Sequence, residues 1–157
     1  MSEAIDIAVV GATGAVGEAM MEILEQREFP VGKLYALASE RSAGKTVRFR
    51  GKSITVSDLA EFDFSKTAIA LFSAGGSVSK EHAPRAAASG CVVIDNTSHF
   101  RRQADIPLVI PEVNPGALAA YRSTRIIANP NCSTIQMLVA WKPIYDAVGI
   151  SRINFAT

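Results

Sequence analysis

The stretch that decides the fold is "IDIAVVGATGAVGEAMMEILEQR", residues 5–27. Its first part, "IDIAVVG", predicts a buried strand that stops at Gly11. The part after the glycines has apolar residues on one face at helical spacing, which predicts a helix over 15–27. Gly11, Gly14 and Gly17 stand between the two and around the start of the helix. The stretch therefore predicts a strand, a tight glycine turn and a helix.

Outward from this stretch, β-rich runs alternate with helical ones. We expect strands at 33–39, 67–76, 91–98 and 125–129, a hairpin over 46–56, and helices at 79–90, 114–121 and 133–149. The hairpin is expected to turn at Gly51 and Lys52. Pro84 is expected in a first helical turn or at a bend, and Pro143 at a helix break. This alternation predicts an α/β fold with a doubly wound, mainly parallel sheet.

The alternation stops near Asn129, where one long helix and a strand-like run, 151–157, follow. We therefore expect a nucleotide-binding domain over 1–128 and the beginning of a second, α+β domain over 129–157. A strand needs a neighbour, so the end at Thr157 suggests a fragment in which the second domain is incomplete.

Composition excludes several classes of protein. The 157 residues are 48% hydrophobic and 20% charged, with a formal net charge of +1, which is typical of a globular protein and unlike a nucleic-acid or membrane-surface binder. The N-terminus "MSEAIDIAVV" lacks the basic region of a secretory signal. Cys91 and Cys132 are too few for a disulfide framework. We expect a cytoplasmic protein that binds neither nucleic acid nor membrane.

The glycine turn is of a kind that binds phosphate. Glycines let the backbone approach a diphosphate, and the N–H groups of the helix start point at it. Thr13 either adds a hydroxyl to the phosphate or caps the helix at Gly14. The alternative is that the three glycines only shape a strand-to-helix turn.

The segment after the second strand, "SERSAGK" at 39–45, distinguishes between nucleotides. Glu40 suits the ribose hydroxyls of NAD. Ser39, Arg41 and Ser42 suit the oxygens of a 2′-phosphate. The segment favours NADP over NAD, unless it is only a solvated loop.

Two further strand ends should lie at the same edge of the sheet. "FSAGGS" at 72–77 ends in glycines that face a ligand or merely make a turn. "DNTSHFRR" at 95–102 places Arg101 and Arg102 where an anion would bind, although surface arginines are common. His82 and His99 are given no role.

The two cysteines differ in their surroundings. Cys91 begins the run "CVVI" and is expected to be a small buried side chain. Cys132 follows "NPN" at the expected start of a helix, whose dipole favours the thiolate that attacks a carbonyl carbon. Asn131 and nearby N–H groups could then hold an oxyanion. The alternative is a capping sequence in which Cys132 is incidental.

Together these motifs resemble the aspartate-semialdehyde dehydrogenase family, from the first strand to the last residue. The matching runs, in the family's order, are "GATGAVG", "SERSAGK", "FSAGGSVS", "DNTSHFR", "PEVN" and "NPNCSTIQM". The related acyl-phosphate reductases, such as N-acetyl-glutamyl-phosphate reductase, share the architecture, but "NPNCST" favours the aspartate enzyme. The resemblance implies a Rossmann-like NADP-binding domain followed by a catalytic one.

The resemblance also implies an activity and its residues. The reaction would be the reversible, NADPH-dependent reductive dephosphorylation of L-aspartyl-4-phosphate to the semialdehyde, in lysine, threonine and methionine biosynthesis. Cys132 would form a thioester, Asn131 would assist at the oxyanion, and Arg101 would bind the substrate phosphate. The implied cofactor residues are Gly11, Thr13, Gly14, Ala15, Val16, Ser39, Arg41, Ser42, Ser73, Gly75 and Asn96. No metal is implied, and the full-length enzyme would be a homo-oligomer.

One departure limits what we expect of this chain. The family's substrate-positioning glutamine, carboxylate-binding arginine and acid/base histidine belong to the second domain, beyond Thr157. His99 stands at a variable position of the family motif and does not replace that histidine. We therefore expect negligible turnover from the isolated chain, and exposed apolar surface if it stands alone. The rival hypothesis is a nucleotide-binding module without catalysis.

Overall fold

The computed structural model describes residues 4–156, and within them six parallel strands form one sheet. The sheet order is β5-β2-β1-β6-β7-β8. The strands are β1 (Ile5–Val10), β2 (Val31–Ala38), β5 (Ser57–Asp58), β6 (Ile69–Phe72), β7 (Val92–Asp95) and β8 (Ile126–Ala128). Strands β3 (Thr46–Phe49) and β4 (Lys52–Thr55) pair separately as an antiparallel hairpin. The predicted doubly wound α/β fold is confirmed.

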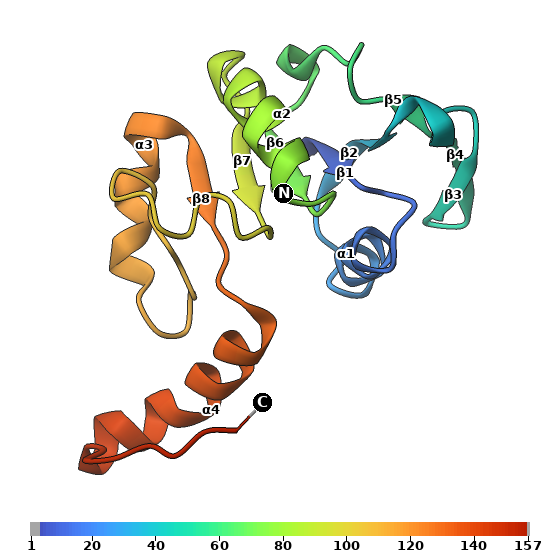
Figure 1. The fold of residues 1–157 in the computed structure, drawn as a ribbon. Coiled ribbons are helices and arrows are strands. Elements are labelled where there is room, and N and C mark those ends of the chain that lie inside the picture. Colours follow the sequence, from blue (N-terminus) through green and yellow to red (C-terminus); the bar gives the residue numbers. More distant parts are fainter. Residues whose placement is uncertain (1–3, 157) are drawn as a thin grey trace.

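Four α-helices and three short 3₁₀ helices lie between and after the strands in this part of the chain (Figure 1). The α-helices are α1 (Ala15–Gln26), α2 (Gly76–Ala88), α3 (Tyr121–Thr124) and α4 (Cys132–Val148). The 3₁₀ helices are η1 (Glu40–Ser42), η2 (Phe64–Lys66) and η3 (Pro115–Ala120). The expected elements near 15–27, 79–90, 114–121 and 133–149 are therefore all present.

The central strand β1 explains why both faces of the sheet are covered. Ile7 and Val9 are buried in a cluster that includes Met21 of α1 and Phe49 of β3. Ala8 and Val10 are buried in the opposite cluster, which includes residues of α2. Successive side chains of a strand point to opposite faces. A continuous apolar run such as "IAVV" is therefore what a central parallel strand requires.

The register brings four strand ends to one edge. Val10 pairs with Phe72, Phe72 with Asp95, and Asp95 with Ala128. Because all these strands are parallel, the residues that follow each of them lie along the same carboxyl edge. The glycine turn, the "SAGG" turn, Asn96 and the "NPNC" segment therefore share this edge.

Several local predictions are wrong. The hairpin turns at Arg50 and Gly51, because Phe49 pairs with Lys52; both central residues have positive φ, 49° and 71°, which matches the twist of a two-residue turn. Helix α2 begins at Gly76, so Pro84 lies in its interior and not in its first turn. Helix α4 continues through Pro143. The run 151–156 contains no strand, and Thr157 lies outside the described residues.

Helix α4 extends away from the body that holds the sheet, and the chain after it turns back alongside (Figure 1). None of its residues is buried. Ile144, Tyr145 and Val148 are 52%, 59% and 81% exposed, so the expected exposed apolar surface is present. Among residues 4–156, no helix combines the length and apolar character needed to cross a bilayer.

Candidate functional site

A cleft of about 580 Å³ opens at the carboxyl edge, across the ends of β1, β2, β5 and β6. Seven of the predicted cofactor residues line it: Gly11, Thr13, Gly14, Ser39, Arg41, Ser42 and Ser73. They come from three segments far apart in the sequence. The structure therefore joins the glycine turn, the "SERS" segment and the "SAGG" turn into one site, as the motifs predicted.

The glycine-turn end of the cleft is shaped for close approach. Gly11 has φ +89°, and a Cβ there would lie 3.0 Å from the Ser73 hydroxyl. A Cβ on Gly17 would lie 2.3 Å from the Gly11 carbonyl oxygen, so Gly17 lets α1 pack against the turn. At Gly14 only the Gly11 carbonyl oxygen comes within 4 Å of such a Cβ, at 3.4 Å. The open side of Gly14 therefore faces the cleft.

Helix α1 begins without a side-chain cap. Gly14 is the N-cap, and no side chain accepts a hydrogen bond from the first turn. The capping alternative for Thr13 is thus ruled out, and its hydroxyl is left for other partners. Ala15 and Val16 do not line the cleft themselves but form that first turn. Their N–H groups are the ones that a bound anion would accept from.

The second-strand end forms the polar part of the cleft. Ser39 to Ser42 wind into η1, where Ser42 N donates to the Ser39 carbonyl oxygen at 2.8 Å. Glu40 and Arg41 are both exposed and both line the cleft. The segment presents a guanidinium and hydroxyls, together with one carboxylate, to whatever occupies the space.

The remaining wall was missed by sequence reasoning. It includes Asp58 at the end of β5, Leu59 and Ala60 after it, and Val78 and His82 on α2. Strand β5 has only two residues, too few to leave a periodic pattern. Val78 and His82 are four residues apart and therefore share one helix face. This four-residue spacing could have identified Val78 and His82 from the sequence, if the helix had been predicted to begin at Gly76.

Further along the edge, Arg101 holds the segment before α4. Its Nε donates to the Asn129 carbonyl oxygen at 2.9 Å, and its Nη2 donates to the carbonyl oxygens of Asn96 and Pro130 at 3.1 and 3.3 Å. The Asn129 amide also donates to Asn96 Oδ1 at 2.7 Å. Arg101 and Asn96 therefore position the residues that lead to Cys132.

The buried carboxyl group of Asp95 stabilises the turn that carries Asn96 and Arg101. Asp95 is fully buried, and it accepts hydrogen bonds from the hydroxyls of Ser79 and Thr97 at 2.7 and 2.8 Å. It also accepts one from Thr97 N at 3.2 Å. Asp95 thereby ties α2 to the turn that carries Asn96 and Arg101. Sequence reasoning gave it no role, because burial cannot be read from "DNTS".

Cys132 is the first residue of α4 and is exposed. Asn131 caps the helix, its side-chain oxygen accepting from Ser133 N at 3.0 Å. Asn131 is therefore the N-cap of α4, and its amide nitrogen makes no hydrogen bond within residues 4–156. Whether Cys132 is incidental to this cap, as the capping alternative holds, is not decided by the cap. Cys91, in contrast, is fully buried, and burial raises the pKa of its thiol above the ordinary value, although a hydrogen bond from Thr67 opposes this.

The predicted residues thus fall into two groups along one edge. The first group consists of the residues that line the cleft. Gly75, the N-cap of α2, directly follows Ala74, which also lines the cleft. The other group comprises Asn96, Arg101, Asn131 and Cys132. Asn96 joins the two, since its N–H donates to the Phe72 carbonyl oxygen at 2.9 Å, next to Ser73.

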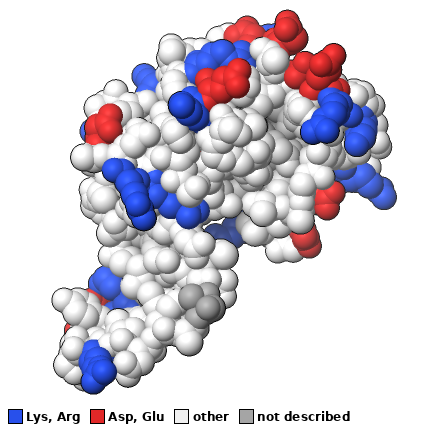
Figure 2. Space-filling model, viewed as in Figure 1, with Lys and Arg blue, Asp and Glu red and all other residues white. Residues whose placement is uncertain are grey.

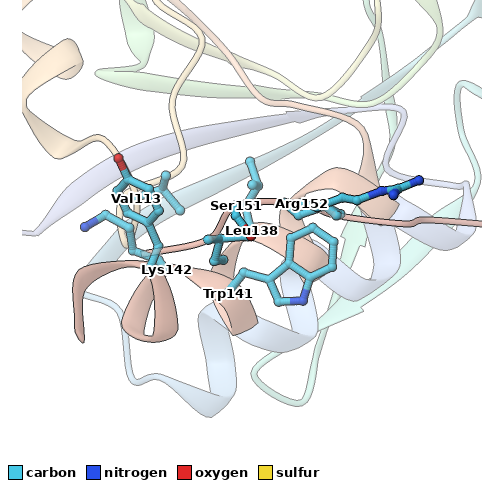
Figure 3. Close-up of a pocket in the computed structure, with 9 residues that line it drawn as sticks. Val113, Leu138, Trp141, Lys142, Ser151 and Arg152 are labelled. Atoms are coloured by element: carbon cyan, nitrogen blue, oxygen red, sulfur yellow. The ribbon is translucent and has the colours of Figure 1, made fainter. Parts of the chain in front are cut away.

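A second hollow, about 380 Å³, lies between α4 and the chain that follows it (Figure 3). Its lining is mostly apolar and includes Leu138, Trp141 and Ile153. Neither Cys132 nor any of the predicted cofactor residues lines it. We therefore take the edge of the sheet as the functional site. Residues 4–156 contain no group of three or more His, Cys, Asp or Glu that could hold a metal ion.

Comparisons with known proteins identify the family of this chain. The family described as "Semialdehyde dehydrogenase, NAD binding domain" matches residues 6–121. Aspartate-semialdehyde dehydrogenase 2 of Vibrio cholerae is 66% identical over all 157 residues, which correspond to 47% of that protein. The chain therefore spans about half the length of this relative.

Solved structures give the same result. The crystal structure of aspartate semialdehyde dehydrogenase II from Vibrio cholerae complexed with ASA superposes with a TM-score of 0.92 at 65% identity, covering 96% of this chain and 49% of that one. The Candida albicans aspartate semialdehyde dehydrogenase with NADP has a TM-score of 0.76 at 25% identity, covering 94% of this chain and 48% of that one.

Proposed function

The chain belongs to the semialdehyde dehydrogenase family, through its NAD-binding domain, and from this premise we propose that it binds NADPH and carries the nucleophile of an aspartate-semialdehyde dehydrogenase. The reaction is the reversible reductive dephosphorylation of L-aspartyl-4-phosphate to L-aspartate 4-semialdehyde. The observation that carries the proposal is a cleft lined by the glycine turn and the "SERS" segment, with an exposed helix-start cysteine on the same sheet edge.

The residues of the cleft fit the cofactor. The uncapped first turn of α1 and the Thr13 hydroxyl suit a diphosphate. Arg41 and Ser42 suit the 2′-phosphate, with Ser39 beside them. Ser73, Gly75 and Asn96 lie toward the β6 and β7 ends, on the nicotinamide side. When bound, the reduced nicotinamide supplies the hydride for the reduction.

Cys132 performs the covalent step. Its thiolate attacks the acyl carbon of the substrate, and the C–O bond to phosphate breaks as the tetrahedral oxyanion collapses to a thioester. The amide of Asn131 and the free N–H groups at the start of α4 stabilise that oxyanion. Splitting one displacement into two lowers the barrier of each.

Arg101 is the residue for the departing phosphate. Its Nε and Nη2 already donate to backbone oxygens, whereas its Nη1 makes no hydrogen bond within residues 4–156. The Nη1 hydrogens are thus available to an anionic oxygen. The same side chain holds the Asn129–Pro130 backbone, so one guanidinium positions the nucleophile's segment and binds the substrate.

Nucleotide titration tests the binding half of the proposal. We expect NADPH to bind more tightly than NADH, and Arg41→Ala to weaken NADPH binding about 10-fold while leaving NADH unchanged, because only NADPH offers the 2′-phosphate to the guanidinium. Arg122→Ala, an exposed arginine of α3, is the matched control. Equal affinities for the two nucleotides would contradict the assignment.

Mass spectrometry tests the chemical half. Aspartyl phosphate should release phosphate and leave an acyl group on Cys132, and Cys132→Ser should acquire none. Since the glutamine, arginine and histidine of the family's second domain are not in these residues, turnover by the 157-residue chain should be negligible. Nucleotide binding without any acylation would favour the rival hypothesis, a binding module.

The cellular compartment and the oligomeric state complete the proposal. The free cysteines fit a reducing compartment, so we assign the enzyme to the cytoplasm. We also assign it to a homo-oligomer in its full-length form, which light scattering would test.

A further inference from the structure

His82 stands at the end of the cleft that β2 and β5 bound. It lines the cleft together with Val78, one helical turn earlier, and Leu59 after β5. The His82 side chain is 14% exposed, and Leu59 is buried. This end of the cleft therefore combines apolar side chains with one ring that has hydrogen-bonding nitrogens, next to the Asp58 carboxylate.

Arg85 sets the tautomer of that ring. Its Nη2 lies 3.2 Å from His82 Nδ1, and a guanidinium can only donate, so Nδ1 must accept. The imidazole proton then resides on Nε2. Arg85 is itself held in place, since Nη1 and Nη2 donate to the carbonyl oxygens of Phe62 and Leu59 at 2.8 and 2.6 Å. His82 is thus a neutral ring with Nε2–H as its donor.

The inference that follows rests on the proposed NADPH site. With the diphosphate at the start of α1 and the ribose beside η1, the base is the part of the AMP half still to be placed. In a doubly wound sheet that half lies over the strands beyond the first helix, here β2 and β5. Adenine has apolar faces and ring nitrogens that accept hydrogen bonds, which complements Leu59, Val78 and the Nε2–H of His82.

We infer that His82 binds the adenine ring as a neutral imidazole whose tautomer is set by Arg85, so that protonation of His82 weakens nucleotide binding. A proton on Nδ1 would break its contact with Arg85 and place two cations 3.2 Å apart. The ring would then leave the position from which Nε2–H reaches the base.

The charges around His82 oppose protonation on balance. Burial lowers the pKa of His82 below its ordinary value, and Arg85 lowers it further, whereas Glu81 and Asp58 act in the opposite direction. Because the neutral ring is the binding form, affinity is complete above the ordinary histidine pKa of about 6.5. It falls as the pH drops through the lowered pKa.

The test compares NADPH titrations of the wild type, His82→Gln and His99→Gln between about pH 8 and about pH 5. The 2′-phosphate also gains a proton near about pH 6, but this is common to all three proteins and cancels in the comparison. Glutamine keeps a donor and an acceptor and cannot be charged. His99 is the other histidine, packed edge-on against Phe100.

We expect His82→Gln to bind within about 3-fold of the wild type at high pH and to lose less affinity at low pH. His99→Gln should follow the wild-type pH profile. His82→Ala should weaken NADPH binding about 3- to 10-fold at high pH, the loss of one hydrogen bond and a ring contact. The preference for NADPH over NADH should survive in every variant.

Identical affinities and pH profiles in the wild type, His82→Gln and His82→Ala would overturn the inference and leave the NADPH site standing. Failure of the wild type to bind any nucleotide would instead remove the proposed function itself. Circular dichroism shows whether His82→Ala is folded. If it is unfolded, the pH profile of His82→Gln tests the inference by itself.

Discussion

Asp95 is the single residue whose loss should disturb the site most without contacting a ligand. It is fully buried and accepts three hydrogen bonds from Ser79 and Thr97. Asp95→Ala leaves two hydroxyls and one N–H buried without their partner, so we expect about 2–4 kcal/mol of lost stability in denaturant unfolding.

Two further variants sharpen this prediction. Asp95→Asn keeps the shape and can still accept from one hydroxyl, so it should cost about 1 kcal/mol. Asp105→Ala removes an exposed aspartate a few residues along the chain and should change stability by less than about 0.5 kcal/mol. A cost for Asp95→Ala no larger than that of Asp105→Ala would show that the buried network is dispensable.

The two thiols should differ sharply in reactivity. Cys91 is fully buried with a raised pKa, so a thiol-alkylating reagent at neutral pH should leave it untouched in the folded protein. Cys132 is exposed at the start of α4 and should be alkylated. Mass spectrometry of Cys132→Ser should show no labelling until denaturant is added. A Cys132 that reacts no faster than a free thiol would contradict its activation.

At the scale of elements, the turn between β1 and α1 depends on Gly17. An added Cβ would lie 2.3 Å from the Gly11 carbonyl oxygen and 2.9 Å from Ala12 Cα. Both are backbone atoms of the turn, so the helix must shift. We expect Gly17→Ala to lower the free energy of unfolding by about 1–3 kcal/mol and to weaken NADPH binding.

Gly116→Ala is the matched control for Gly17→Ala. It lies in η3, where nothing comes within 4 Å of an added Cβ, and the change should stay within about 0.5 kcal/mol. A Gly17→Ala protein as stable as this control would mean that α1 is free to move away from the turn.

Elements with their own periodic pattern could be predicted from the sequence, and those that depend on neighbours could not. The strand "IAVV" and the glycine turn carry local signals, which is why β1, α1 and the glycine-turn end of the cleft were predicted. The end of the cleft that contains His82 was missed, because β5 has two residues and Val78 and His82 meet Leu59 only after folding. The Arg50–Gly51 turn was misplaced by one residue, since non-glycine residues rarely adopt positive φ.

At the scale of the whole molecule, two stretches of apolar surface stand out within residues 4–156, besides single exposed side chains such as Val16 and Ile23 on α1. One is α4, where Ile144, Tyr145 and Val148 are exposed, and in the view of Figure 2 the projecting segment carries few charged side chains. The other is a hollow of about 410 Å³ over β6, β7 and β8, lined by residues such as Val92, Ile94 and Ile127. The β1–β2 half of the same face is covered by α1 and the β3–β4 hairpin.

The division of the chain near Asn129 stays a prediction, and we propose it with the boundary placed by packing. Helix α4 buries no residue, whereas Asn129 and Pro130 are bound to the sheet edge by Arg101. Physically, the nucleotide-binding part should therefore extend through Pro130, with the helix outside it.

Truncation after Asn131 tests that division. Because α4 contributes no buried side chain, removing 132–157 should change the stability of the remainder by less than about 0.5 kcal/mol and leave NADPH affinity unaltered. Fluorescence of a hydrophobic dye should fall as the apolar helix is lost. Truncation after Ala128 should lower the free energy of unfolding by about 1 kcal/mol more than truncation after Asn131, because Arg101 then loses two of its three hydrogen-bond acceptors. If the chain ending at Asn131 unfolded or lost its nucleotide, α4 would have to be counted as part of the first domain.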